Sequence, residues 1–221
     1  MISRLVHIPA GPSGTVSLEG MLELPDNATG VVLFAHGSGS SRLSPRNNYV
    51  ARVLRDAGLG TLLIDLLTQR EDMDYATRFD IPLLTRRLLA ATRWLQGEPA
   101  TLSLAIGYFG ASTGAAAALQ AAAEEGRKIA AVVSRGGRPD LAGEEALNRV
   151  AAPTLLIVGG FDDVVIGLNR EAHRALRCQK DLIVIPGATH LFEEPGALEQ
   201  VARHAAHWFG KFMPHFGAES R

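Results

Sequence analysis

Short apolar runs alternate with longer amphipathic segments along most of the chain. The runs carry Val, Ile and Leu at consecutive positions, which is typical of strands buried on both faces of a parallel sheet. They predict strands at residues 31–35, 61–65, 102–109, 129–134, 154–158 and 182–185. Between the strands, apolar residues recur three and four positions apart, which indicates helices. These helices are predicted near residues 45–57, 80–96, 112–125, 167–177 and 196–212.

The N-terminal residues follow a different pattern. Two extended segments, around residues 2–9 and 15–24, are joined by Gly11-Pro12-Ser13-Gly14, which predicts an antiparallel hairpin at the edge of the sheet. The later alternation of strands and helices predicts an α/β fold in three layers, with a mostly parallel sheet between helices. No repeat or linker divides the sequence, so we expect residues 1–221 to form a single domain. The longest polar connection, residues 68–80, is expected to flank the site and leaves little room for a cap.

Composition and charge narrow the possible functions. Of the 221 residues, 47% are hydrophobic and 20% are charged, which is typical of a globular protein. Because 22 basic residues oppose 23 acidic ones, no basic excess favours binding to nucleic acid or to an anionic membrane. No apolar run is long enough to span a bilayer and no signal-peptide pattern is present, so we expect a cytoplasmic protein. Cys178 is the single cysteine and no Cys or His spacing indicates zinc, so we expect no metal and no cofactor.

The sequence Gly110-Ala111-Ser112-Thr113-Gly114 carries the first candidate chemistry. It matches the pattern G-x-S-x-G and lies between a predicted strand and an alanine-rich predicted helix, which is the context that this motif requires. On such a sharp turn the Ser112 hydroxyl projects from the end of the sheet, beside a helix N-terminus that favours negative charge. The alternative is an ordinary strand-to-helix turn in which Ser112 only caps the helix.

A serine becomes a nucleophile only with a base to remove its proton and an acid to orient that base. Asp162 comes shortly after the predicted strand 154–158, and His190 comes shortly after the last predicted strand. Both residues, like Ser112, therefore follow the carboxyl ends of parallel strands, which meet at one edge of a sheet. The order Ser112, Asp162, His190 is the chain order found in α/β-hydrolases. The sequence therefore predicts a Ser-His-Asp triad.

A fourth component lies upstream, in His36-Gly37-Ser38-Gly39 after the strand at 31–35. The backbone N–H groups of Ser38 and Thr113 are predicted to form an oxyanion hole for a tetrahedral intermediate. We interpret His36 as a scaffold residue that hydrogen-bonds the loop backbone.

The chain resembles the α/β-hydrolase superfamily over nearly its whole length, through residues 36–39, 110–114, 159–165 and 187–190. Its compact size, its Ser-Thr-Gly-Ala turn and the loop 134–140 resemble the dienelactone hydrolase-like branch, including serine-containing members that are sometimes fused to phosphoribosyltransferase domains. Dienelactone hydrolase itself uses a cysteine nucleophile, whereas this turn has Ser112. The family pattern places a small apolar residue soon after the acid, and Val165 meets it for Asp162. Asp163 and Asp140 are the competing acids.

The resemblance implies a cofactor-independent serine hydrolase that cleaves a carboxylic ester, thioester or lactone of a small soluble substrate through an acyl-enzyme. Ser112 would attack the carbonyl carbon, His190 would carry the proton and Asp162 would orient the imidazole. Two alternatives stay open. One is an acyltransferase that uses the same triad, and the other is a non-catalytic binding module that retains the fold.

Four arginines are expected in loops at the catalytic edge: Arg42, Arg46, Arg135 and Arg138. Either they bind a carboxylate or phosphate on the substrate, or they form ion pairs with acids of neighbouring loops. Arg135 is the best candidate for substrate binding because it follows a predicted strand directly, and Arg42 is the second candidate.

Overall fold

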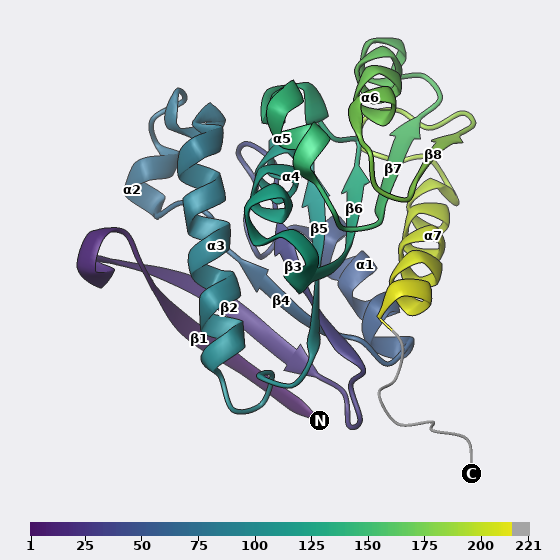
Figure 1. Ribbon diagram of the computed structural model, residues 1–221. Helices are drawn as coiled ribbons and strands as arrows, with labels where there is room; N and C mark the ends of the chain where they lie inside the picture. Colours follow the sequence, from purple (N-terminus) through teal and green to yellow (C-terminus); the bar gives the residue numbers. More distant parts are fainter. Residues whose placement is uncertain (214–221) are drawn as a thin grey trace.

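The computed structural model describes residues 1–213 and is built around one eight-stranded sheet (Figure 1). The strand order is β1-β2-β4-β3-β5-β6-β7-β8. Strand β2 pairs antiparallel with both β1 and β4, and the remaining neighbours are parallel. This arrangement confirms the predicted α/β class with an antiparallel N-terminal edge. The strands are β1 (Ile2–Ala10), β2 (Val16–Leu24), β3 (Gly30–Ala35), β4 (Gly60–Ile64), β5 (Ala105–Ala111), β6 (Ile129–Arg135), β7 (Thr154–Gly159) and β8 (Lys180–Ile185).

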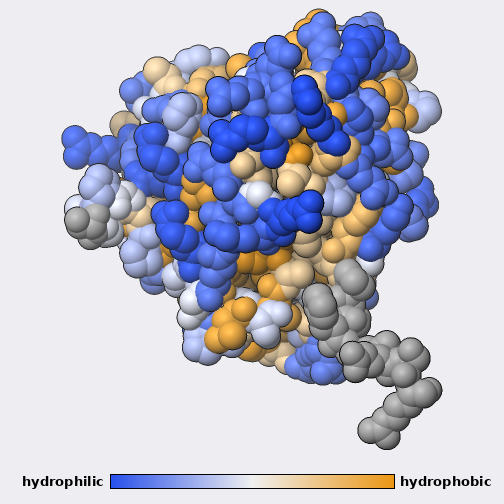
Figure 2. Space-filling view, viewed as in Figure 1, coloured by the Kyte–Doolittle hydropathy of each residue, from blue (hydrophilic) through white to orange (hydrophobic). Residues whose placement is uncertain are grey.

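Helices cover both faces of the sheet (Figure 1). One face carries α1 (Pro45–Asp56) and α7 (Ala197–Phe212), and the other carries α3 (Ile81–Gly97), α4 (Thr113–Glu125), α5 (Glu144–Arg149) and α6 (Asp163–Ala175). Successive strand residues feed the two cores in turn, as with Leu33 towards α3 and α4 and Phe34 towards α1 and α7. The outer surface in this view is mostly hydrophilic, with scattered apolar patches (Figure 2). No helix within residues 1–213 combines the length and the apolar character that crossing a membrane requires.

Local sequence explains where the main helices begin. The Ser44 hydroxyl accepts a hydrogen bond from the N–H of Asn47 (3.3 Å) at the start of α1. The Asp80 carboxylate accepts from the N–H of Leu83 (2.9 Å) at the start of α3. Both are N-cap interactions that satisfy otherwise unpaired helix donors. The small side chains of α4 are almost all buried, which lets this helix lie close against the sheet beneath the serine turn.

Several boundaries differ from the predicted ones. Strand β5 begins at Ala105 and not at residue 102, because the chain turns at residues 101–104. Helix α6 begins at Asp163, four residues before the predicted start, because its first turn contains the β-branched residues Val164, Val165 and Ile166, which are weak helix formers and do not mark a helix start. The sequence pattern also missed α2 (Gln69–Asp72), α5 and the short 3-10 turns, which are too short to show a helical period. These turns are η1 (Pro12–Gly14), η2 (Thr77–Phe79), η3 (Gly126–Lys128) and η4 (Pro139–Ala142).

Candidate active site

Ser112 occupies a strained turn between β5 and α4. Its backbone angles, φ 49° and ψ −121°, are rare for residues other than glycine and cost about 1–3 kcal/mol. The hydroxyl does not cap α4, so the interpretation of Ser112 as a simple helix cap is wrong. Because the Ser112 hydroxyl makes no hydrogen bond to the helix and its backbone is strained, Ser112 is a candidate catalytic residue.

Two glycines let the strained turn pack directly against its neighbours. A methyl group on Gly110 would lie 2.4 Å from the Cα atom of Ala115 in α4. A methyl group on Gly114 would lie 2.2 Å from the carbonyl oxygen of Ala35 at the end of β3. Larger residues at either position would push α4 away from the sheet, which explains the G-x-S-x-G pattern in steric terms.

Backbone hydrogen bonds hold the strained conformation on both sides of Ser112. Its N–H donates to the carbonyl of Arg135 at the end of β6 (3.2 Å). Its carbonyl accepts from the N–H groups of Ala115 and Arg138, each at 3.1 Å. The serine is therefore fixed to the helix that follows it and to the loop beside it, the over-determined setting in which backbone strain persists.

Asp162 and His190 form a close pair at the same edge of the sheet. The Nδ1 atom of His190 donates to Oδ2 of Asp162 at 2.6 Å, a short charge-assisted hydrogen bond. The Asp162 side chain is 16% exposed and that of His190 is 38% exposed, so the acid is sheltered while the ring reaches the surface of the site. With its proton on Nδ1, the ring presents Nε2 as a free acceptor.

Main-chain contacts between two loops bring this pair together. The N–H of Gly160 donates to the carbonyl of Ile185 (2.8 Å), and the N–H of Phe161 donates to the carbonyl of Ala188 (2.9 Å). The loops pack so closely that a methyl group on Gly159 would lie 2.5 Å from the Ala188 carbonyl oxygen. The loop after β7 and the loop after β8 therefore form one unit that carries the acid and the histidine.

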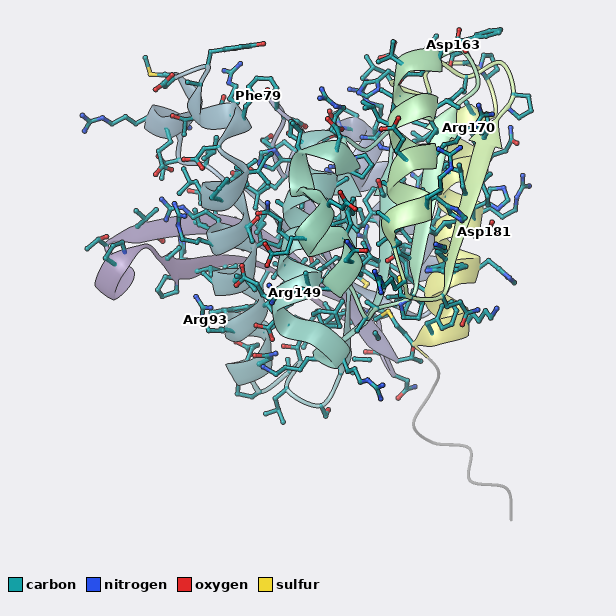
Figure 3. The ribbon with its side chains drawn as sticks, turned by 45° about the horizontal axis from the view of Figure 1, so that its top comes forward. Phe79, Arg93, Arg149, Asp163, Arg170 and Asp181 are labelled. Atoms are coloured by element: carbon teal, nitrogen blue, oxygen red, sulfur yellow. The ribbon has the colours of Figure 1, made fainter. Side chains whose placement is uncertain are left out.

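The two competing acids lie elsewhere. Asp163 is exposed at the start of α6, where its charge favours the helix N-terminus (Figure 3). Asp140 binds the Arg138 guanidinium through two hydrogen bonds, at 2.7 and 2.9 Å, and this contact raises the pKa of Arg138. Of the three candidate acids, only Asp162 contacts His190.

Ser112 and His190 border the same short segment of chain. The Arg135 carbonyl is bonded to Ser112, and a methyl group on the next residue, Gly136, would lie 3.5 Å from Cε1 of the His190 ring. No hydrogen bond joins the Ser112 hydroxyl to this ring, although both residues belong to the described part of the chain. Catalytic hydrogen bonds of this kind commonly tighten only when substrate binds.

Ser38 and Thr113 line the same small cavity at the end of β3. Within residues 1–213, neither backbone N–H donates a hydrogen bond. Thr113 is the first residue of α4, and N–H groups at this position have no partner inside the helix. A methyl group on Gly37 would lie 3.0 Å from Cβ of Ser112, which shows how closely this loop approaches the serine. The N–H groups of Ser38 and Thr113 therefore remain candidates for an oxyanion hole close to Ser112.

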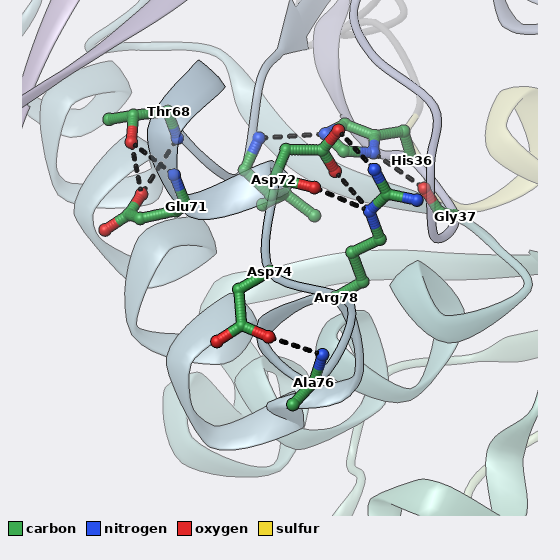
Figure 4. A network of polar contacts seen from close by, with 9 residues as sticks. His36, Gly37, Thr68, Glu71, Asp72, Asp74, Ala76 and Arg78 are labelled. Carbon is green, nitrogen blue, oxygen red and sulfur yellow. Dashed lines mark hydrogen bonds and ion pairs between the residues drawn. The ribbon is translucent and has the colours of Figure 1, made fainter.

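His36 fixes the start of this loop. Its Nε2 atom accepts from the N–H of Leu66, and its Nδ1 atom donates to the carbonyl of Gly37, both at 2.9 Å (Figure 4). Burial lowers the pKa of the His36 ring, which favours the neutral form that these two bonds need. The interpretation of His36 as a scaffold residue is confirmed.

The segment 68–80 braces the other side of the loop. Helix α2 begins with a capping box in which the side chains of Thr68 and Glu71 each accept from the other residue's N–H (3.2 and 2.8 Å). Arg78 forms an ion pair with Asp72 at 3.0 Å (Figure 4). A methyl group on Gly39 would lie 3.4 Å from the Arg78 guanidinium. The longest polar connection therefore flanks the candidate oxyanion loop.

The two arginines predicted as substrate-binding residues differ in what they contact. Arg42 pairs with Asp65 and with Glu19, the latter at 2.6 Å, so its guanidinium is engaged within the chain. Arg135 is 8% exposed and pairs with no acid among the described residues. Of the two, only Arg135 has guanidinium nitrogens, Nε and Nη1, that are buried without a hydrogen-bond partner.

Phe192 lies beside Arg135 and is not identified by the sequence pattern. It has a positive φ of 56°, and its buried ring lies 5.9 Å from Cζ of Arg135. An aromatic residue two positions after the histidine gives no signal beyond that of an ordinary core residue.

Within residues 1–213, no group of three or more His, Cys, Asp or Glu side chains is placed to hold a metal ion.

The sheet, its two helical layers and the serine turn are those of an α/β-hydrolase fold. The chain belongs to the dienelactone hydrolase family, whose family model matches residues 18–219. A solved structure of a dienelactone hydrolase from Anabaena variabilis is 57% identical, with a TM-score of 0.91 over 96% of this chain and 99% of that one. Est1E from Butyrivibrio proteoclasticus shares the fold at 16% identity, with a TM-score of 0.79 over 95% and 98% of the two chains.

Longer relatives are also found. Two proteins of Mycobacterium tuberculosis, from strains CDC 1551 and H37Rv, are provisionally named phosphoribosyl transferases. Each is 58% identical to this chain over 204 residues, which is 92% of this chain and 45% of the relative. The chain thus spans about half the length of these relatives, and their name applies to the longer proteins.

Proposed function

We propose that this chain is a serine hydrolase that cleaves a carboxylic ester, thioester or lactone of a small substrate, with Ser112, His190 and Asp162 as its catalytic triad. The observation that carries the proposal is the pairing of two features at one sheet edge. One is a strained serine whose hydroxyl does not cap its helix. The other is a histidine bound at 2.6 Å to a sheltered carboxylate. Membership of a hydrolase family supports the same reaction class.

Acylation follows from the position of each group. As Nε2 of His190 removes the hydroxyl proton, Oγ of Ser112 forms a bond to the substrate carbonyl carbon. The N–H groups of Ser38 and Thr113 stabilise the negative charge that develops on the carbonyl oxygen. The bond to the leaving oxygen or sulfur then breaks, and the His190 imidazolium gives its proton to the leaving group. Asp162 holds the ring orientation and stabilises its cation throughout.

Deacylation reverses these roles with water as the nucleophile. His190 removes a proton from water, the oxygen adds to the acyl carbon, and the bond between the acyl carbon and Ser112 Oγ breaks. The proton held by His190 returns to Oγ, so one water molecule is consumed and the carboxylic acid is released. Apart from substrate and water, residues of this chain supply every group that the two half-reactions use.

A fluorophosphonate probe tests this proposal. Wild type should give one covalent adduct on Ser112 and a burst of phenolate with an activated short-chain ester, and Ser112→Ala should give neither. Ser40→Ala is the matched control because it removes a hydroxyl from the neighbouring loop, and it should label and turn over like wild type. If wild type shows neither labelling nor a burst, the hydrolase proposal fails and a binding module is favoured.

A further inference from the structure

The Arg135 side chain is an exception among the arginines of this structure. Every other buried or half-buried arginine within residues 1–213 pairs with an Asp or Glu carboxylate. Arg135 is 8% exposed, and its Nε and Nη1 atoms are buried without a hydrogen-bond partner. Burial and the nearby charge of Arg46 lower the pKa of Arg135 to about 10, so the group is still a cation at neutral pH. A buried, unpaired cation is unfavourable in the free protein and indicates a missing anion.

The position of this guanidinium relates it to the candidate active site. Arg135 is the last residue of β6, and its strand neighbours Ala131 and Val133 face the core beneath α1 and α7. On the same face its guanidinium lies 5.9 Å from the ring of Phe192, two residues after His190. Its carbonyl is bonded to the N–H of Ser112.

The sheet order places Arg135 on a definite side of Ser112. Strand β5, which ends at the serine, lies between β3 and β6. The loop after β3 carries the Ser38 donor, so the carbonyl oxygen of a bound ester points towards that side. The opposite side holds Arg135 and His190, and the histidine must reach the leaving oxygen to protonate it. A substituent that contacts Arg135 therefore belongs to the leaving group and not to the acyl chain.

We propose that Arg135 binds an oxyanion, a carboxylate or phosphate, on the alcohol or thiol part of the substrate, so that the site selects esters of anionic alcohols. The inference rests on the hydrolase function proposed above. A guanidinium offers a planar pair of donors that matches either anion. Arg46 adds positive charge nearby, but its Nη1 atom pairs with Glu193 at 2.7 Å, whereas Arg135 pairs with no carboxylate among residues 1–213.

Two pairs of matched esters separate the two sides of the site. 4-Acetoxybenzoate and 4-acetoxybenzamide differ by a charge on the leaving group, and phenyl hydrogen succinate and phenyl succinamate differ by a charge on the acyl chain. 4-Acetoxyphenyl phosphate distinguishes phosphate from carboxylate. Each kcat/KM is divided by the rate of alkaline hydrolysis of the same ester, which removes differences in intrinsic reactivity. The proteins are wild type, Arg135→Met and Arg170→Met, the last removing an exposed charge on α6 (Figure 3).

Wild type and Arg170→Met should prefer 4-acetoxybenzoate or the phosphate to the amide. Arg135→Met should lose about 10- to 100-fold in kcat/KM for the anionic esters, with the amide within about threefold of wild type. An equal loss for the charged and neutral members of the first pair would show a structural role and overturn the proposal. A selective loss for phenyl hydrogen succinate would overturn the placement on the leaving-group side.

Two measurements without turnover keep the inference separate from the hydrolase function. Binding of 4-hydroxybenzoate and of phenyl phosphate, measured by calorimetry, should be detectable with wild type and lost with Arg135→Met. If wild type binds neither anion, the proposal fails even when Ser112 labels normally. The Tm of Arg135→Met should equal or exceed that of wild type, because an unpaired buried charge has been removed. If that variant does not fold, Arg135→Lys should fold and show a weaker preference for the anionic esters, and full preference would count against the proposal.

Discussion

Replacement of Asp162 by Asn tests the acid–base pair most directly. The change keeps the size of the side chain and removes the charge that faces His190 across a 2.6 Å hydrogen bond. Since the ring is 38% exposed, a surface-like dielectric constant of about 20 is appropriate. Under these conditions, opposite charges whose centres are about 4 Å apart attract by about 4 kcal/mol. Because about 1.4 kcal/mol corresponds to a factor of ten, kcat is expected to fall about 10³-fold. A wrong ring tautomer would extend the loss to about 10⁴-fold.

The assay is the burst and steady-state hydrolysis of an activated short-chain acetate ester, with the rate of fluorophosphonate labelling as a second readout. Asp163→Asn is the matched control, since this carboxylate is exposed and lies in the first turn of α6. It should change kcat by less than about twofold and cost at most about 1 kcal/mol of stability. A full-rate Asp162→Asn enzyme, or a slow Asp163→Asn enzyme, would refute the assignment of the acid.

Three further predictions concern the scaffold. Gly114→Ala should lower Tm and abolish ester hydrolysis, because its methyl group would lie 2.2 Å from the Ala35 carbonyl oxygen. Gly167→Ala in α6 is the control. Its methyl group would have no neighbour within 4 Å, so the variant should be as stable as wild type or more stable by up to about 1 kcal/mol. Because burial lowers the pKa of His36, the unfolded chain takes up a proton at higher pH than the folded one, so denaturant stability should fall as pH drops below about 6.5. This fall should be shallower in His36→Asn, and equal slopes would contradict the neutral buried ring. Arg42→Ala should cost about 1.5–3 kcal/mol through its lost contacts with Asp65 and Glu19, without changing the rate ratio of charged to neutral esters; a changed ratio would place Arg42 in the substrate site.

The order of apolar and polar residues was sufficient to predict the elements whose composition is set by burial within their own segment of the chain. Apolar runs identified the six central strands and the hairpin, since burial of both faces dictates their composition. The start of α6 was misplaced because its first turn consists largely of β-branched residues, and α5 was missed because it is too short to show a helical period.

In the candidate site too, some features follow from the local sequence and others depend on residues that are distant in the chain. The location of Ser112, Asp162 and His190 at one edge of the sheet could be predicted because each follows a parallel strand, and parallel strands end at one edge. The choice of Asp162 over its neighbour depends on the direction of one side chain, which is set by hydrogen bonds to the loop after β8. The pairing of Arg42 and the isolation of Arg135 depend on residues distant in the chain, and no local pattern encodes them.

The main-chain link between the loops after β7 and β8 has a consequence for substrate range. Since backbone atoms hold Asp162 beside His190, the adjacent side chains carry none of that task. Phe161 is 72% exposed and Leu191 is 40% exposed, so a large apolar side chain precedes Asp162 in the chain and another follows His190, both at the surface. We expect substitutions at these two positions to change the apolar surface beside the pair and to leave intact the main-chain hydrogen bonds that hold Asp162 next to His190. A search for variants with altered preference for substrate chain length would therefore begin at Phe161 and Leu191.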